Sequence, residues 1–149
     1  MSNSKICIPL SVPEEQKTYF KKRYKDATKD SGKFFIFAAD QKMEHLNADF
    51  YGNGISAESA HPEHIFKIAQ QGNVGALATH LGMINRYGAE YSGLNYIVKI
   101  NGKTNLVQQD VADPCSLSLC DVGDVADLAV RSKLNILGVG YTIYLGSES

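Results

Sequence analysis

Four short apolar runs, separated by segments with helical signals, constrain the fold of this 149-residue chain most strongly. The first run is aromatic and apolar, is too short for a typical helix and predicts a buried strand. The four runs are Phe34–Ala39, Val74–Thr79, Tyr96–Ile100 and Ile136–Gly140. Because strands that alternate with helices form parallel sheets built of βα units, the pattern predicts an α/β fold.

Two segments between these runs have the end signals of helices. Pro62–Gln70 begins with proline, which suits the first helical position, and Gly72 lies just beyond its end. Val122–Lys133 is acidic at its start and basic at its end, which complements the helix dipole. We therefore expect a helix before the second run and another before the fourth.

Chain length selects between two architectures. A complete (β/α)8 TIM barrel takes roughly 250 residues, so four strands fit its amino-terminal half. A small doubly wound sheet is the alternative. Leu145–Ser149 offers no helix to cover the last strand, which favours an interrupted barrel. We expect residues 1–32 to form an N-terminal basic helical segment, and residues 33–149 to form the first four βα units of an incomplete barrel.

The first 33 residues carry a net charge of +4, with eight Lys or Arg against four acidic residues. Within them, Lys17–Lys25 interleaves basic and aromatic side chains, as an RNA-binding strip would. We favour an amphipathic helix, with Ser11 as its N-cap and Pro13 in its first turn.

Composition excludes several classes of protein. Fifteen Lys or Arg balance 16 Asp or Glu, which argues against a protein that coats nucleic acid or an anionic membrane. No run approaches the ~18 apolar residues that span a bilayer, and Met1–Lys5 lacks the apolar region of a signal peptide. Cys7, Cys115 and Cys120 are odd in number and lack zinc-like spacing. We expect a soluble, cytoplasmic protein with no nucleic-acid or membrane partner.

Asp40, which ends the first run, is a candidate general base or charge partner. Function in parallel α/β folds gathers at the carboxyl ends of strands. Strand alternation places Asp40 on one face with Ala38 and Ile36, where a carboxylate is partly desolvated unless it is paired. The ordinary alternative is a turn aspartate.

Lys99 lies inside the third apolar run, on one face with Ile97 and Asn101. Lysine is rarely buried without a partner, and a desolvated lysine has a lowered pKa that suits imine or proton chemistry. The alternative is an edge-strand lysine that faces water. In a closed barrel, Asp40 and Lys99 would both point into the mouth and pair.

Other apparent motifs indicate no cofactor. Gly102–Thr104 is similar to the end of a phosphate-binding loop, but Ile97 stands where that motif requires an earlier glycine. Gly138–Gly140 is similar to the start of a dinucleotide-binding fingerprint, but Ile143 stands where that motif requires its third glycine. Four side chains are of types that suit zinc or manganese, but nothing fixes their geometry, so we expect no metal. They are Asp40, Glu44, His45 and His80.

Six segments, in this order and spacing, resemble the archaeal-type class I fructose-bisphosphate aldolase family. They are Phe37–His45, Asp49–Gly52, Pro62–Ala69, Ala78–Gly82, Ile97–Leu106 and Gly138–Ser147. Each is modest evidence alone, but the match covers nearly the whole chain. The family also includes enzymes that make aromatic precursors from related sugars.

The resemblance implies a TIM barrel that reversibly cleaves fructose 1,6-bisphosphate into dihydroxyacetone phosphate and glyceraldehyde 3-phosphate. The family uses a lysine Schiff base and no metal. By this resemblance Asp40 is a catalytic residue that contacts substrate and helps to handle protons, and Lys99 is a catalytic residue that gives electrostatic support. Gln41 and Asn101 are substrate-binding positions, although many members have histidine at the position of Gln41.

The resemblance also implies that half of the site is missing. The family's Schiff-base lysine lies on the sixth strand, its proton-donating tyrosine on the fifth, and its phosphate-binding loops after the seventh and eighth. We therefore expect this chain to be inactive alone, and to bind phosphorylated sugar as a homo-oligomer or with a complementing carboxyl-terminal half. A non-catalytic half-barrel that binds sugar phosphate or a partner, and a related aldolase for another phosphorylated sugar, are the alternatives.

Overall fold

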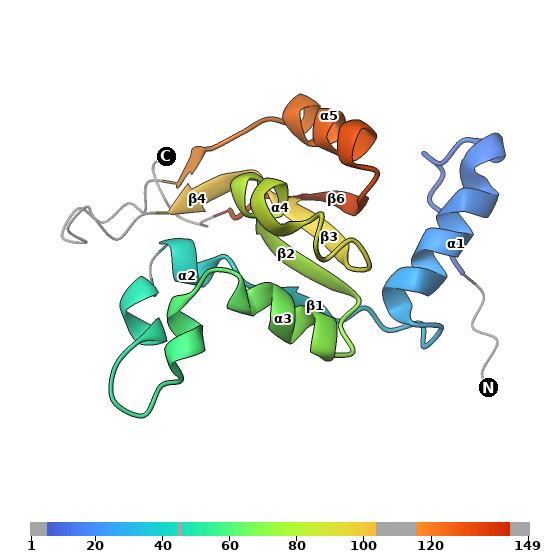
Figure 1. Cartoon of the computed structure of the whole chain (residues 1–149). Coiled ribbons are helices and arrows are strands. Elements are labelled where there is room, and N and C mark those ends of the chain that lie inside the picture. Colours follow the sequence, from blue (N-terminus) through green and yellow to red (C-terminus); the bar gives the residue numbers. More distant parts are fainter. Residues whose placement is uncertain (1–5, 45, 104–115, 144–149) are drawn as a thin grey trace.

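The computed structural model describes residues 6–44, 46–103 and 116–143 (Figure 1). A short 3-10 turn, η1 (Glu14–Gln16), leads into α1 (Lys17–Thr28). The elements that follow include the four predicted strands, with at least one helix between each of these strands and the next. They are β1 (Ile36–Ala38), α2 (Gln41–Glu44), η2 (Asn47–Phe50), η3 (Ala57–Ala60), α3 (His64–Gln71), β2 (Ala76–His80), α4 (Leu81–Tyr87), β3 (Asn95–Lys99), β4 (Asn101–Lys103), β5 (Ser116–Ser118), α5 (Val122–Ser132) and β6 (Asn135–Gly140).

The main sheet has the strand order β1-β2-β3-β6, and each neighbouring pair is parallel. This order follows the chain, whereas a doubly wound sheet reverses its order at a switch point. The predicted amino-terminal half of a TIM barrel, with four parallel strands, helices and a preceding N-terminal helix, is therefore confirmed. A separate antiparallel pair, β4 and β5, lies beyond the carboxyl end of β3.

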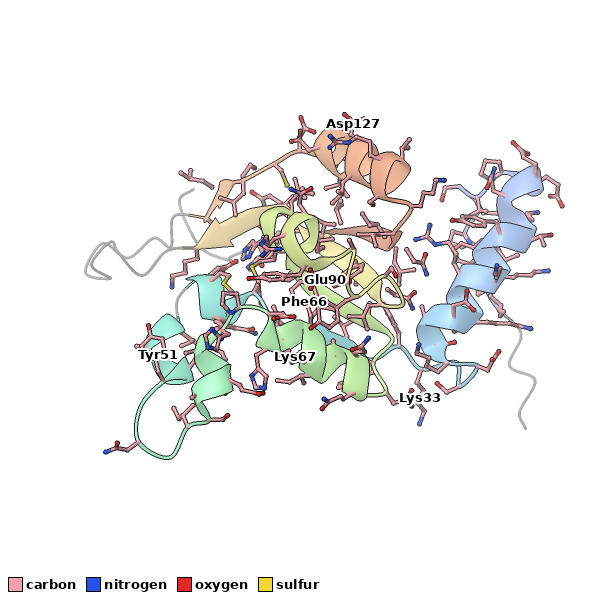
Figure 2. The ribbon with its side chains drawn as sticks, viewed as in Figure 1. Lys33, Tyr51, Phe66, Lys67, Glu90 and Asp127 are labelled. Carbon is pink, nitrogen blue, oxygen red and sulfur yellow. The ribbon has the colours of Figure 1, made fainter. Side chains whose placement is uncertain are left out.

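One hydrophobic core joins a single face of the sheet to α3, α4 and α5. Phe66 of α3 is fully buried at its centre, with its ring centroid 5.4 Å from those of Tyr87 and Tyr91 (Figure 2). From the sheet, Tyr96 and Val98 of β3 are both fully buried. Because strand side chains alternate, the residues between and after them point to the opposite face.

The first strand differs from its prediction. The sequence predicts a buried strand over Phe34–Ala39, but only Ile36–Ala38 forms β1, and Phe35 and Ile36 are 62% and 41% exposed. These side chains are exposed because of where the strand lies in the sheet. Within the described residues, β1 is an edge strand, and no second layer covers the sheet face opposite the helices.

Helix α1 lies across the amino end of the sheet, at the opposite end from α2 (Figure 1). A guanidinium N–H of Arg23 donates to the carbonyl of Ile136. Ala27 approaches the start of β2 so closely that a Cβ at Gly75 would lie 2.1 Å from the Ala27 carbonyl oxygen, so only glycine fits there. The predicted Ser11 cap is wrong, because the turn η1 precedes α1 and places Gln16 at its N-cap.

No helix among the described ranges is long and apolar enough to cross a membrane. The domain boundary predicted at residue 32 stays a prediction.

Candidate active site

Asp40 and Lys99 meet at the carboxyl end of the sheet. Lys99 is the last residue of β3, and Asp40 lies two residues beyond the end of β1. The Lys99 Nζ donates to Asp40 Oδ2 over 2.6 Å. The pairing that the sequence predicts is therefore confirmed, across 59 residues of chain.

Glu44 completes this ion pair, and the sequence analysis missed that role. Its Oε1 accepts from Lys99 Nζ at 2.6 Å and lies 2.7 Å from His80 Nε2. Its Oε2 accepts from the backbone N–H of Lys103 at 3.2 Å. A sequence signal exists, because Glu44 stands four residues after Asp40 and so shares a face of one helical turn with it.

The pKa of Lys99 is raised. Burial disfavours the charged ammonium and lowers the pKa, but the hydrogen bonds that Lys99 donates to Asp40 and Glu44, together with their negative charges, outweigh it. The lowered pKa that the sequence analysis expects for a desolvated lysine is therefore wrong. Lys99 is a fixed cation, and its amine is held in the form that does not act as a nucleophile.

The potential metal ligands gather around this ammonium. Asp40, Glu44 and His80 are brought together, while His45 lies outside the described residues. The Lys99 ammonium occupies the position between the two carboxylates that a cation would take. In the part of the chain that the structure describes, no group of three or more His, Cys, Asp or Glu side chains could hold a metal ion.

Gln41 supports the other oxygen of Asp40. With its amide oriented to satisfy its neighbours, the Gln41 side-chain nitrogen donates to the Ala38 carbonyl at 3.0 Å and to Asp40 Oδ1 at 3.2 Å. The side chain is half-buried beside the ion pair. Its predicted role in substrate binding stays a prediction.

Asn101 is fully buried and is not beside Asp40 in the hydrogen-bond network. Its Nδ2 donates to Ser116 Oγ at 2.8 Å and to the Thr142 carbonyl at 2.9 Å, and its Oδ1 accepts from the Thr142 N–H at 2.9 Å. These bonds join β4 to β5 and to the segment that follows β6. Substrate binding by Asn101 stays a prediction, and its observed contacts are within the protein.

A second buried lysine, Lys42, anchors the long connection after α2. Its Nζ donates to the carbonyls of Ser59 and His61, the latter at 3.0 Å, and lies 5.1 Å from the Phe50 ring centroid. Burial lowers the pKa of Lys42. This lysine thereby ties η2 and η3 to the short helix that carries Gln41 and Glu44.

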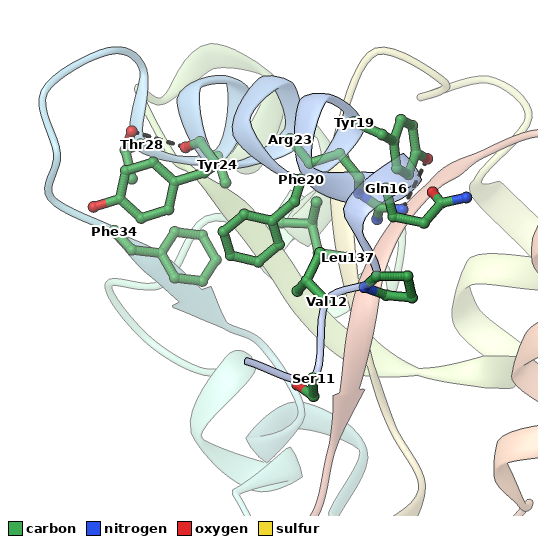
Figure 3. A pocket seen from close by; sticks show the side chains of 12 residues that line it. Ser11, Val12, Gln16, Tyr19, Phe20, Arg23, Tyr24, Thr28, Phe34 and Leu137 are labelled. Atoms are coloured by element: carbon green, nitrogen blue, oxygen red, sulfur yellow. Dashed lines mark hydrogen bonds between the residues drawn. The ribbon is translucent and has the colours of Figure 1, made fainter. Parts of the chain in front are cut away.

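An apolar cavity of about 460 Å³ lies at the other end of the sheet, between α1 and the strands (Figure 3). Tyr19, Phe20 and Tyr24 of α1 line it together with Phe34 and Leu137. Sites in α/β barrels lie at the carboxyl ends of the strands, whereas this cavity lies at the amino ends. We therefore place the candidate active site at Asp40 and Lys99.

Charged side chains gather at the carboxyl ends of the strands in this half-barrel, as they do in α/β-barrel enzymes. The fold and the site therefore place the chain in that class of protein. Residues 34–149 match the model of the DeoC/LacD family aldolases, and the chain belongs to this family. The resemblance found in the sequence is confirmed.

Two relatives show the same similarity along nearly the whole chain. It is 53% identical over 143 residues to the fructose-bisphosphate aldolase/6-deoxy-5-ketofructose 1-phosphate synthase of Methanocaldococcus jannaschii, covering 96% of this chain and 46% of that protein. The solved fructose-bisphosphate aldolase from Slackia heliotrinireducens superposes with a TM-score of 0.88 at 43% identity, covering 99% of this chain and 46% of that one. The chain therefore spans about half the length of these relatives.

Proposed function

We propose that this chain forms the first half of the active site of a class I fructose-bisphosphate aldolase. The reaction is the reversible cleavage of fructose 1,6-bisphosphate into dihydroxyacetone phosphate and glyceraldehyde 3-phosphate. The observation that carries the proposal is the Asp40–Lys99 ion pair at the carboxyl end of the sheet, in a chain 53% identical to a protein named as such an aldolase. A cytoplasmic location belongs to the same proposal.

Asp40 is the member of the cluster that is best placed to meet a substrate. Its side chain is 18% exposed, against 3% for Glu44 and 9% for Lys99. In aldol cleavage, the fragment that holds the imine keeps the electron pair of the breaking carbon–carbon bond. The hydroxyl on the other carbon of that bond must lose its proton to become the aldehyde. Asp40 binds that part of the sugar and takes part in moving the proton, while the Lys99 charge keeps the carboxylate in place.

The Schiff-base lysine comes from outside this chain. Imine formation needs a neutral amine, and two carboxylates hold Lys99 as an ammonium. Lys42 is committed to the carbonyls of Ser59 and His61. The relatives are about twice as long, so the remaining half of a barrel supplies the reacting lysine and the phosphate site, as a complementing carboxyl-terminal half or in a homo-oligomer.

A second candidate is an aldolase that acts on a different phosphorylated sugar. The Methanocaldococcus jannaschii relative carries the name 6-deoxy-5-ketofructose 1-phosphate synthase beside that of fructose-bisphosphate aldolase. The same half-site would serve both reactions. A non-catalytic half-barrel is the third candidate, and the exposed face around Ile36 is the observation that favours it.

Borohydride trapping with dihydroxyacetone phosphate, followed by mass mapping of the modified lysine, tests the proposal. We expect no adduct on this chain alone, and a stoichiometric adduct on the added half when the carboxyl-terminal half of the Methanocaldococcus jannaschii relative is supplied. An adduct on Lys99, Lys42 or Lys103 would contradict the account of the missing lysine.

No adduct in either mixture would favour the non-catalytic candidate. Asp40→Ala serves as the matched variant, because it removes the carboxylate at the mouth without changing the sheet face that meets the added half. It should leave association with that half intact and lower the cleavage rate of the mixture. Comparing 6-deoxy-5-ketofructose 1-phosphate with fructose 1,6-bisphosphate in the same mixture separates the first two candidates.

A further inference from the structure

One carboxylate, that of Glu44, receives contacts from three other elements of the half-barrel. The Lys99 ammonium comes from β3, the His80 ring from the end of β2, and the Lys103 N–H from β4. The Glu44 side chain is 3% exposed. A buried carboxylate is costly unless such donors satisfy it, so this arrangement specifies one position for the side chain.

The glycine of β4 keeps this cluster closed on one side. A Cβ at Gly102 would lie 3.5 Å from both Glu44 Oε1 and His80 Nε2, and 2.9 Å from a methyl carbon of Leu119. Backbone therefore packs directly over the contact between Glu44 and His80. This packing excludes water, and a charged hydrogen bond is stronger where water is excluded.

Two carboxylates act on Lys99 in different ways. Asp40 lies at the more exposed side of the ammonium and Glu44 at the deeper side, and both bonds are 2.6 Å. A lysine chain with a single partner can rotate away from it, since the ammonium is a point charge on a flexible stem. The second, buried partner removes that freedom.

We propose that Glu44 is a positioning residue, which fixes the Lys99 ammonium beside Asp40, and that His80 holds Glu44 in the orientation required. The proposal rests on the proposed function only for what Asp40 and Lys99 do to a substrate. The positioning itself concerns contacts among residues of this chain, and it is tested without any measurement of aldolase activity.

The test measures how fast each lysine of the full chain is acetylated by trace acetic anhydride, which attacks only the neutral amine, across a range of pH. Mass mapping gives the rate at Lys99 relative to the exposed Lys22. We expect Glu44→Gln to raise the relative rate at Lys99 about tenfold, the change that one pKa unit produces. The matched control is Glu63→Gln, which removes a carboxylate bonded to Tyr91 at 2.8 Å and should leave Lys99 as in the unmodified chain.

A pair of substitutions at His80 tests the second part, and decides the matter if Glu44→Gln does not fold. His80→Gln keeps a side-chain N–H donor, so Lys99 should be acetylated at the unmodified rate. His80→Leu removes the donor, and the rate should rise severalfold. Circular dichroism establishes that each variant is folded.

A folded Glu44→Gln chain with an unchanged rate at Lys99 would overturn the positioning role. An equal rise in His80→Gln and His80→Leu would overturn the role of the histidine. If Lys99 responds as expected but borohydride traps no adduct in either mixture, the positioning stands and the aldolase proposal fails.

Discussion

The two faces of the sheet differ in how completely their side chains are covered. The helix-covered face is tightly packed, with Phe66, Leu77 and Tyr96 fully buried. The opposite face leaves Ile36 of β1 41% exposed, although it is an apolar strand residue. Apolar strand faces are stable when a second layer covers them. The comparison teaches that one face of this chain is complete, while the other requires a further covering layer.

The largest effect should come from the covered face. Phe66→Ala removes the aromatic side chain at the centre of the core and leaves a cavity, so we expect the free energy of unfolding to fall by about 4 kcal/mol. Urea denaturation followed by circular dichroism measures it. Phe35→Ala, which removes a ring that is 62% exposed, is the matched control, and a loss of more than about 1 kcal/mol there would contradict the contrast between covered and uncovered side chains.

Removing the buried cation should lower the free energy of unfolding by a somewhat smaller amount. Lys99→Met leaves Asp40 and Glu44 together without their ammonium, and losing one partner of a buried ion pair costs about 3 kcal/mol. Denaturation at neutral pH checks this value. An effect below about 1 kcal/mol would show that the pair is solvated like a surface salt bridge.

The same variant has a defined pH dependence. The pKa of Lys99 is raised in the folded chain from an ordinary value of 10.5, so the ammonium is present in both states below that pH and its contribution is complete. As the pH rises through the folded-state pKa, the contribution is lost. The difference in stability between the unmodified chain and Lys99→Met should therefore be constant near neutral pH and shrink in alkali. A difference that grows with pH would contradict the sign.

A smaller effect is expected at Lys42. Lys42→Met keeps the length of the side chain but leaves the carbonyls of Ser59 and His61 without this donor, at a cost of about 1 to 2 kcal/mol. Hydrogen exchange should report faster opening of residues 46–63, with the helix-covered core unchanged. Equal protection of that segment in the two chains would show that Lys42 does not anchor it.

Ile36→Ser should have the smallest effect on unfolding, and it tests the uncovered face of the sheet most directly. We expect the free energy of unfolding to change by less than about 0.5 kcal/mol. Sedimentation should show that the unmodified chain is oligomeric or aggregates, and that Ile36→Ser associates less. Val130→Ser, on the outer surface of α5 and 79% exposed, is the control that should leave association unchanged. A monodisperse monomer of 16.3 kDa for the unmodified chain would contradict the incomplete face.

Local patterns were sufficient for most of the elements. Apolar runs and end signals predict strands and helices close to β2, β3, β6, α3 and α5, because periodicity, proline, glycine and charge act within a few residues. Helix α4 was not predicted, because it begins directly after β2 without a proline, an acidic residue or a capping side chain to mark its start, although Arg86 and Gly88 mark its end. The pair β4 and β5 was missed because its partners are separated by a long stretch of chain.

The sequence by itself determined that strands and helices alternate, that Asp40 and Lys99 lie at the ends of the first and third strands, and that the chain resembles half of an aldolase. Only the tertiary structure decided that Glu44 is the second partner of Lys99, that Asn101 bonds to Ser116 and Thr142, and that the pKa of Lys99 is raised rather than lowered. The reason is physical. Periodicity is a property of neighbouring residues, whereas the protonation of a buried lysine depends on charges that the fold brings from 55 and 59 residues away.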